Sequence, residues 1–141
     1  MSKAVCQKLW HQMCMIRDKY RCVLCDDYAW PHVHHIIKKS EGNARHQINI
    51  YNGIVLCGAK KTYNCHDKVH KHGRQWLIDR LPTRLPSKRF EAILALDRAS
   101  HEVCREKLDY KAIKAELKTE LVTQTELYEA ELDSDIQPDR R

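Results

Sequence analysis

Four of the seven cysteines in the chain form two pairs that could bind a metal ion. Cys22 and Cys25 have the Cys-x-x-Cys spacing of a metal-binding knuckle, whereas seven residues separate Cys57 from Cys65, a longer gap than usual. Two cysteine pairs can complete a tetrahedral zinc site with four sulfur ligands. Such a site has no open coordination position, so we expect a structural Zn²⁺ that fixes the two parts of the chain to each other.

The other three cysteines, Cys6, Cys14 and Cys104, are isolated in the sequence. An isolated cysteine is usually a small buried apolar residue. The odd total and the lack of an export signal favour metal ligands over disulfides for the paired ones.

Histidines form a second set of candidate ligands. His66 and His70 are four residues apart, so a helix would place both imidazoles on one face. A third ligand could come from His34 on a preceding strand, which would leave open positions for water and substrate, as in a catalytic site. Adjacent strand residues point to opposite sides, so His34 and His35 would divide the roles of metal ligand and general base. His32 shares a side with His34, and spacing alone does not choose between them.

The segments HVHHI, YNGIVLC and CHDKVH together resemble the motif of HNH endonucleases, over roughly residues 20–72. The resemblance implies a ββα-metal fold, in which two strands and a helix hold one divalent ion. It implies that His34, His66 and His70 bind this ion and that His35 is the general base. Asn52 would tether the loop and hold the imidazole of the base in orientation.

A member of this family would be a metal-dependent DNA endonuclease, which hydrolyses phosphodiester bonds with metal-assisted loss of the 3′ oxygen. The catalytic ion would be Mg²⁺, Mn²⁺, Ni²⁺ or Zn²⁺, because histidine ligands suit several divalent ions. The segment IRDKYRCVLC before the knuckle resembles phage HNH and recombination nucleases. The downstream segments RQWLIDRL and CREKLDYKAIKAELKTEL are more loosely similar to the C-terminal part of the NinG (Rap) family of phage lambda recombination proteins. That similarity implies a phage-encoded enzyme of DNA recombination or processing, acting on duplex or branched DNA.

Charge is unevenly distributed along the chain. The net charge is +6, with +9 over residues 1–109 and −3 over residues 110–141. A basic body with an acidic end suits a polyanionic partner bound by the body, here DNA. The basic residues near the motif, as candidate phosphate contacts, are Lys38, Lys39, Arg45, Lys60, Lys61, Lys68, Lys71 and Arg74. Four histidines have no motif support and are expected to be surface or supporting groups: His32, His46, His72 and His101.

Hydrophobic periodicity and turn residues predict an α+β fold. The expected elements are a helix over 4–20, strands over 33–37 and 50–56 joined by a loop, a short helix over 65–72 capped by Asn64, and helices over 74–81 and 87–99, the latter capped by Ser87. The chain then divides into a zinc-stapled nuclease domain with its N-terminal helix (1–81), a helical extension (82–132) and a disordered tail (133–141).

A last, long helix is expected after Asp109, which would cap it. Its seam at spacings of three and four is formed by Tyr110, Ile113, Leu117, Leu121, Gln124 and Tyr128. The seam could pack on the body of the protein or form a homodimer through residues 110–132, and the sequence favours neither.

Apolar runs are short, and the N-terminus lacks the apolar stretch of a signal peptide. We therefore expect a cytoplasmic protein without membrane contact, in the bacterial host cytosol if it is phage-encoded. Two other functions fit parts of the sequence. A non-catalytic zinc-binding nucleic-acid module would explain the cysteines and the basic body, and a structural partner protein would act through residues 110–132.

Overall fold

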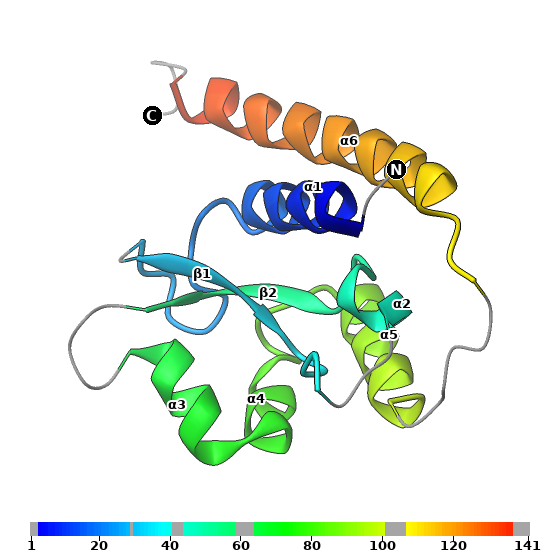
Figure 1. Ribbon diagram of the computed structural model, residues 1–141. Coiled ribbons are helices and arrows are strands. Elements are labelled where there is room, and N and C mark those ends of the chain that lie inside the picture. The colour runs from blue at the N-terminus through cyan, green and yellow to red at the C-terminus, as the bar shows by residue number, and fades with distance from the viewer. Residues whose placement is uncertain (1–2, 29, 41–43, 59–63, 101–106, 137–141) are drawn as a thin grey trace.

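The computed structural model describes residues 3–28, 30–40, 44–58, 64–100 and 107–136. The predicted contacts Lys60 and Lys61, together with His101, Cys104 and the end of the predicted tail, lie outside this described part. In chain order the elements are α1 (Lys3–Arg17), β1 (Pro31–His35), α2 (Ala44–Gln47), β2 (Gly53–Cys57), α3 (Cys65–His72), α4 (Arg74–Arg80), α5 (Ser87–Arg98) and α6 (Tyr110–Ile136). The expected α+β class is confirmed at the level of helices around a small sheet (Figure 1).

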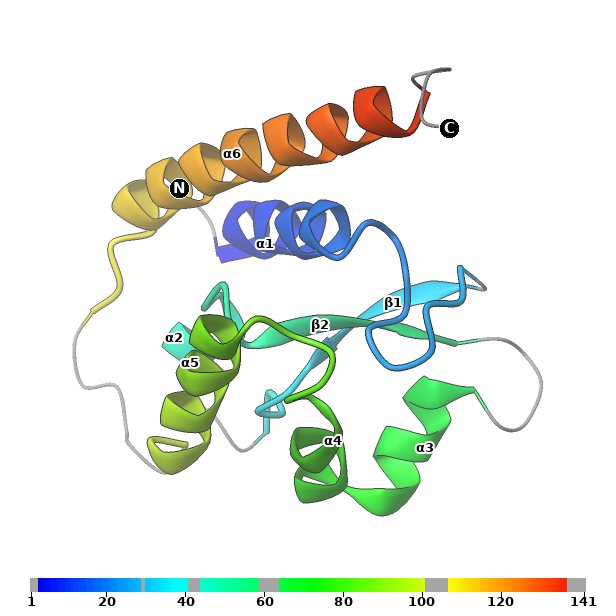
Figure 2. The same ribbon diagram turned by 180° about the vertical axis from the view of Figure 1, so that it is seen from behind.

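Within the described residues, β1 and β2 form an antiparallel two-stranded sheet. Helices α1 and α6 lie on one side of this sheet, and α3 and α4 lie on the other (Figures 1 and 2). β2 is therefore buried along its whole length. Strand residues alternate between the two faces. Val33 and His35 contact the α1 side, whereas His32 and His34 contact α3.

Two apolar clusters hold these layers together. The cluster between the sheet and α3, α4 and α5 includes Ile54, Leu56, Val69, Leu77 and Ile93. The cluster between the sheet, α1 and α6 includes Trp10, Met13, Ile48 and Leu117. Burial of this apolar surface is the main stabilising term of the fold, and it presses α3 against the sheet.

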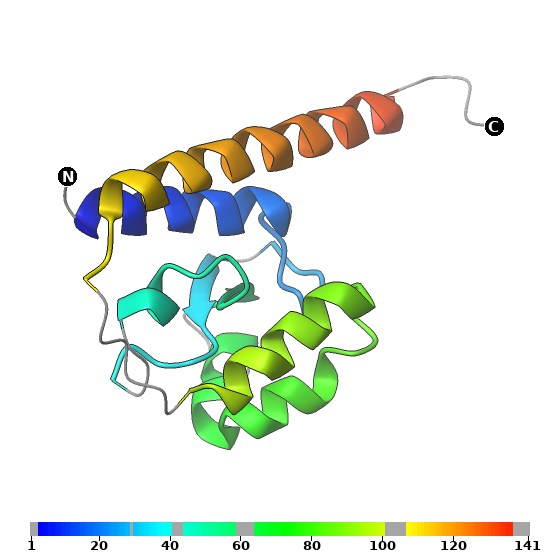
Figure 3. The same cartoon turned by 90° about the vertical axis from the view of Figure 1, so that its right-hand side faces the viewer.

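Helix α6 packs along α1, and the two helices run side by side in the same direction (Figure 3). Leu117 is buried in the contact, with Ile113 and Leu121 partly buried beside it. The predicted seam thus packs on the body of the protein. Asp109 caps the helix as expected, because its Oδ1 accepts hydrogen bonds from Lys111 N at 3.1 Å and Ala112 N at 3.2 Å.

Several predicted boundaries are wrong. The first strand ends at His35, because Asn52 N, which would donate to Ile36 O in a continued ladder, donates to Asn49 O at 3.0 Å. Ile37 N in turn donates to the side-chain Oδ1 of Asn52 at 2.7 Å. The predicted loop over 38–49 contains the short helix α2. The residue that precedes α5 as N-cap is Pro86, and Ser87 is the first helical residue. Helix α6 continues to Ile136, four residues into the segment that we expected to be disordered.

No helix in the described part of the chain is both long and apolar enough to cross a membrane.

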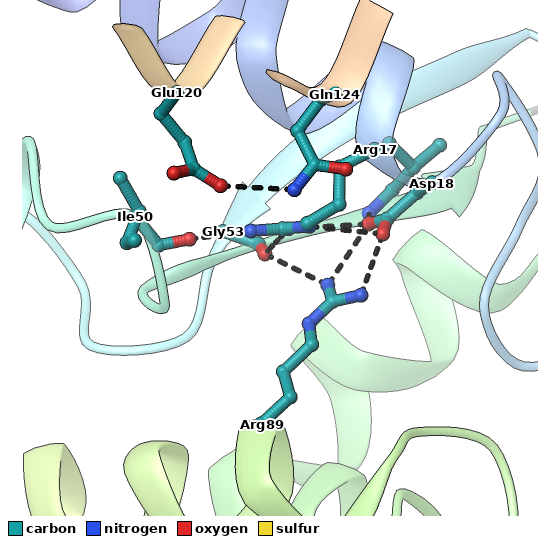
Figure 4. A network of polar contacts seen from close by, with 8 residues as sticks. Arg17, Asp18, Ile50, Gly53, Arg89, Glu120 and Gln124 are labelled. Atoms are coloured by element: carbon teal, nitrogen blue, oxygen red, sulfur yellow. Dashed lines mark hydrogen bonds and ion pairs between the residues drawn. The ribbon is translucent and has the colours of Figure 1, made fainter. Parts of the chain in front are cut away.

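A buried charge network joins α1, β2 and α5 (Figure 4). The Asp18 carboxylate accepts from Arg17 Nε at 3.1 Å and from Arg89 Nη1 at 2.7 Å, and its side chain is only 2% exposed. It also accepts from Val55 N at 3.0 Å, while both guanidinium groups reach the carbonyl of Gly53. The network therefore fixes the end of α1, just before the knuckle, against the strand that carries Cys57.

Candidate metal centres

The four paired cysteines converge at one end of the sheet. Cys22 and Cys25 come from the loop after α1, Cys57 ends β2 and Cys65 begins α3. Their sulfur atoms all lie within 4.8 Å of one another, and the Cys25 and Cys57 Sγ atoms are 3.6 Å apart. Sulfurs bound to one tetrahedral Zn²⁺ at about 2.3 Å are roughly 3.8 Å apart, so the arrangement fits a zinc tetrahedron. We call this group the cysteine cluster.

Backbone hydrogen bonds shape the knuckle that carries the first two cysteines. Cys22 N donates to Asp27 O and Asp26 N donates to Cys22 O, each at 2.9 Å. Asp26 adopts a positive φ of 64°, which aspartate tolerates better than most residues. Val23 N donates to Val55 O at 2.9 Å and so attaches the knuckle to β2. The turn thus shapes the first pair of cysteines, and the bond between Val23 and Val55 brings this pair to the strand that carries Cys57.

The donor set of the cysteine cluster fits a cation. Burial and the neighbouring Cys22 thiol raise the pKa of Cys65, so the environment of the thiol disfavours an isolated thiolate. A divalent cation reverses this balance, because it binds the thiolate form. Cys65 N also donates to Cys57 Sγ at 3.3 Å, a contact that supports a ligand sulfur. The described cysteines are all free of disulfides, which leaves these four sulfurs able to bind Zn²⁺.

Helix α3 serves both sets of candidate ligands. It is capped as predicted: Asn64 Oδ1 accepts from Asp67 N at 2.8 Å, and the helix ends at Gly73, whose φ is 93°. Successive helical residues differ in direction by about 100°. Cys65 can therefore point to the cysteine cluster while His66, the next residue, points elsewhere.

His66 and His70 on α3 meet His34 on β1. A ring nitrogen of each lies within 4.8 Å of the others, and the Nε2 atoms of His66 and His70 are 3.1 Å apart. Two nitrogens at 2.0–2.1 Å from one tetrahedral ion are roughly 3.3 Å apart, close to this value. We call these three residues the histidine cluster. His34 is buried, whereas His70 is exposed, so the cluster opens to solvent on the α3 side.

The environment of His34 favours the neutral imidazole. Burial, followed by the neighbouring His66 and His70, lowers the pKa of His34 to about 3. Burial also lowers the pKa of His66, with His70 adding to the effect. Neutral imidazole is the form that binds metal ions. Three nitrogen donors with one open side thus fit a divalent cation that keeps coordination positions for other ligands.

His35 points to the opposite face of the sheet from the histidine cluster. Its ring stacks on Trp10 of α1, with centroids 4.3 Å apart and an interplanar angle of 18°. Its Nε2 lies 3.1 Å from Gln47 O. A carbonyl oxygen can only accept, so Nε2 carries the proton and Nδ1 carries the lone pair. Of the two adjacent histidines, the structure therefore brings His34 and not His35 to the candidate metal.

Asn52 is fully buried and holds three backbone groups. Its Oδ1 accepts from Ile37 N at 2.7 Å, and its Nδ2 donates to Ile37 O at 3.2 Å and to His46 O at 2.8 Å. The side chain thus ties both ends of the loop between β1 and β2. His46 precedes Gln47, the residue whose carbonyl meets the imidazole of His35. His46 itself is buried, which agrees with a supporting position rather than a surface one.

His32 takes one of the two positions expected for it, that of a supporting group beside the candidate ligands. Its ring stacks on His66, with centroids 5.3 Å apart and an interplanar angle of 17°, so it borders the histidine cluster without belonging to it. A Cβ at Gly58 would lie 2.0 Å from the Cδ2 atom of His32, so the ring occupies space that only glycine leaves free. Two features of the sequence indicate this position of His32. It alternates with His34, so both rings lie on the same face of the strand, and a glycine, Gly58, directly follows the partner strand.

The described basic candidates do not form one uniform surface. The side chains of Lys38, Lys39, Arg45, Lys68 and Lys71 are exposed. Lys68 and Lys71 share α3 with the histidine cluster, and the charge of Lys38 contributes to the lowered pKa of His34. Arg74 instead pairs with Asp97 of α5 at 2.8 Å, which gives it a structural role. Lysines near the histidine cluster are therefore better placed to meet a phosphate than Arg74.

Comparisons with known proteins add no assignment. No protein-family model, no curated protein and no solved structure matches the chain. The interpretation of the two clusters therefore rests on the geometry and chemistry of the side chains described above.

Proposed function

We propose that this protein is a DNA endonuclease of the HNH (ββα-metal) type, with a structural Zn²⁺ in the cysteine cluster and a catalytic divalent ion in the histidine cluster. The observation that carries the proposal is the convergence of one strand-borne and two helix-borne imidazoles, His34, His66 and His70, beside a solvent-exposed helix face. It is supported by the order of the residues along the chain, which resembles that of HNH nucleases.

His35 would act as the general base through Nδ1. Its Nε2 proton is committed to Gln47 O at 3.1 Å, which fixes the tautomer and the ring orientation. Asn52 positions the loop that supplies this carbonyl, through its bond to His46 O. Within the described residues β1 pairs only with β2, so its other edge is unpaired, and its adjacent residues His34 and His35 point to opposite faces of the sheet at that edge. A phosphodiester at this edge would have both imidazoles as neighbours.

A divalent ion in the histidine cluster would supply charge neutralisation for the phosphate and the departing 3′ oxygen. The chain itself would contribute the proton acceptor at His35 and phosphate contacts from Lys38, Lys68 and Lys71. These lysines are exposed and lie near the histidine cluster in sequence or on α3. Phosphate contacts of this kind position DNA without reading its sequence.

A second candidate is a non-catalytic zinc-binding nucleic-acid module. The stacking of His35 on Trp10 favours it, because this packing turns the imidazole toward α1. In that case the histidine cluster would add a second metal or a phosphate contact, and no hydrolysis would follow.

The test is cleavage of supercoiled plasmid and of a four-way DNA junction by wild type, His35→Ala and His35→Phe. Loss of a general base should slow cleavage about 10²- to 10⁴-fold. The phenylalanine variant keeps a ring against Trp10, so its zinc content and thermal unfolding should match wild type. His11→Ala on the exposed face of α1 is the matched control and should cleave normally. Cleavage by His35→Phe at the wild-type rate would reject the base, and no cleavage by wild type with any of Mg²⁺, Mn²⁺, Ni²⁺ or Zn²⁺ would favour the binding module.

A further inference from the structure

A cavity of about 600 Å³ lies between the knuckle, the start of α5 and the middle of α6. Six of its lining side chains are basic, and they are Arg17, Lys19, Arg21, Arg84, Lys88 and Arg89. We name it the cationic cavity, and we propose that it binds a phosphate-bearing ligand of nucleotide size. The inference is independent of the proposed nuclease function, because no member of the histidine cluster lines the cavity.

The floor of the cationic cavity carries an excess of positive charge. Arg17 and Arg89 share the single carboxylate of Asp18, so the network described above has a net charge of +1. Both guanidinium groups already donate to Asp18 and to the Gly53 carbonyl, so they contribute positive charge in a fixed position beneath a bound phosphate. Above this floor lie Glu120 and Gln124 of α6, which bond to each other at 2.9 Å (Figure 4).

The acidic residues at the cationic cavity do not cancel its basic ones. Asp18, Asp26 and Glu120 line the cavity with the six cations. Lys19 also pairs with Glu131 of α6 at 2.5 Å, so an excess of two positive charges remains. Arg84 pairs with Asp26 at 3.3 Å, but both side chains are exposed, so the pair is weak and available for exchange. Lys88 has no ion pair among the described residues, which leaves its ammonium group available to an incoming anion.

The start of α5 adds backbone donors to the same wall. Pro86, Lys88 and Arg89 line the cavity, and the helix runs for 12 residues from Ser87. Its N-cap residue, Pro86, makes no side-chain capping bond. The first intrahelical bond is from Phe90 N to Pro86 O, at 3.0 Å, so the preceding N–H groups have no partner within the helix. Such N–H groups and the helix dipole complement a phosphate whose primary contact is Lys88.

The apolar part of the lining includes Tyr51, Leu85 and Pro86. A site that combines several cations with aromatic and aliphatic side chains suits a phosphate joined to a flat base. The volume also lies in the range of about 300–1,000 Å³ that is typical of small-molecule sites. Inorganic phosphate alone would leave most of this space and the apolar wall without a contact.

The test is calorimetric titration of dAMP, deoxyadenosine and inorganic phosphate into the full-length, zinc-loaded chain. The measurement is repeated in the His66→Ala/His70→Ala background, so that a phosphate cannot be held by a cation in the histidine cluster. We expect dAMP to bind about tenfold or more tightly than either deoxyadenosine or inorganic phosphate, in both backgrounds. Lys88→Gln should weaken the binding of dAMP about tenfold. Lys118→Gln, at an exposed position of α6 outside the cavity, should change the affinity for dAMP less than about twofold.

Oligonucleotides with and without a 5′-phosphate then identify the source of the ligand. A preference for the phosphorylated strand that Lys88→Gln removes would assign the cavity to a DNA end, and equal binding of the two strands would assign it to free nucleotides. Equal binding of dAMP and deoxyadenosine would overturn the proposal. Equal weakening of dAMP binding in Lys88→Gln and Lys118→Gln would also overturn it, because the change in affinity would then depend on net charge alone.

Discussion

The cysteine cluster and the histidine cluster share one helix, to which they contribute the adjacent residues Cys65 and His66, yet the two clusters differ in burial. Three of the four cysteines are buried, and the four come from three separate segments of the chain. The histidine cluster has one buried member, one partly buried member and one exposed member. A four-sulfur site is coordinatively complete and holds segments together, whereas a three-nitrogen site with an open side can exchange its ligands. Under the proposed function, the same helix would support one site for folding and another for chemistry.

The largest effect should follow removal of a cysteine ligand. Cys65→Ser should lose zinc and about 5 kcal/mol or more of the free energy of unfolding, because zinc binding in small domains contributes folding free energy directly. Urea unfolding and zinc content measure the two effects. Cys6→Ser is the matched control, since Cys6 is equally buried but lies outside the cluster. If both variants retained zinc and lost the same unfolding free energy, Cys65 would behave as a buried core cysteine and not as a zinc ligand.

A smaller effect should follow from the network that holds the knuckle against β2. Asp18→Asn leaves Arg17 and Arg89 without their shared counter-charge and should cost about 3 kcal/mol of unfolding free energy. All four sulfur ligands remain, so zinc content should stay at the wild-type level. Loss of zinc in this variant would show that the cysteine cluster depends on the network and is not a self-sufficient site.

The same network predicts a pH dependence. Burial alone would raise the pKa of Asp18, but Arg17 and Arg89 together outweigh it, and the pKa lies below its ordinary value of 3.8. The contribution of Asp18 to stability is therefore complete above pH 3.8 and is lost as the pH falls through the lower folded-state pKa. Thermal unfolding of wild type and Asp18→Asn should converge across that acid window, and parallel curves would contradict the assignment.

Local sequence signals predicted much of this structure. The Asn64 and Asp109 caps, the Gly73 stop and the i, i+4 spacing of His66 and His70 depend on contacts within a few residues, and the structure has them. The four-cysteine grouping was also readable, because few arrangements of two cysteine pairs satisfy a zinc tetrahedron.

The predictions from sequence failed where contacts between residues distant in the sequence determine the structure. Ile36 and Ile37 have strand composition, but Asn52 N bonds to Asn49 O and the Asn52 side chain bonds to Ile37, so the ladder stops at His35. The stacking of His35 on Trp10 joins residues 25 positions apart, and no local pattern indicates it. The Arg17–Asp18–Arg89 network likewise joins α1 to α5, so neither it nor the cationic cavity could be read from spacing.

The measurement that tests the contrast between the two clusters most directly is metal content after zinc loading, before and after brief exposure to EDTA. We predict two metal ions per wild-type chain, of which EDTA removes one, and one EDTA-resistant ion in His66→Ala/His70→Ala. The double variant should lose less than about 1 kcal/mol of unfolding free energy, because both side chains lie at the surface or partly exposed. One ion in wild type, or two ions that leave together, would contradict the account.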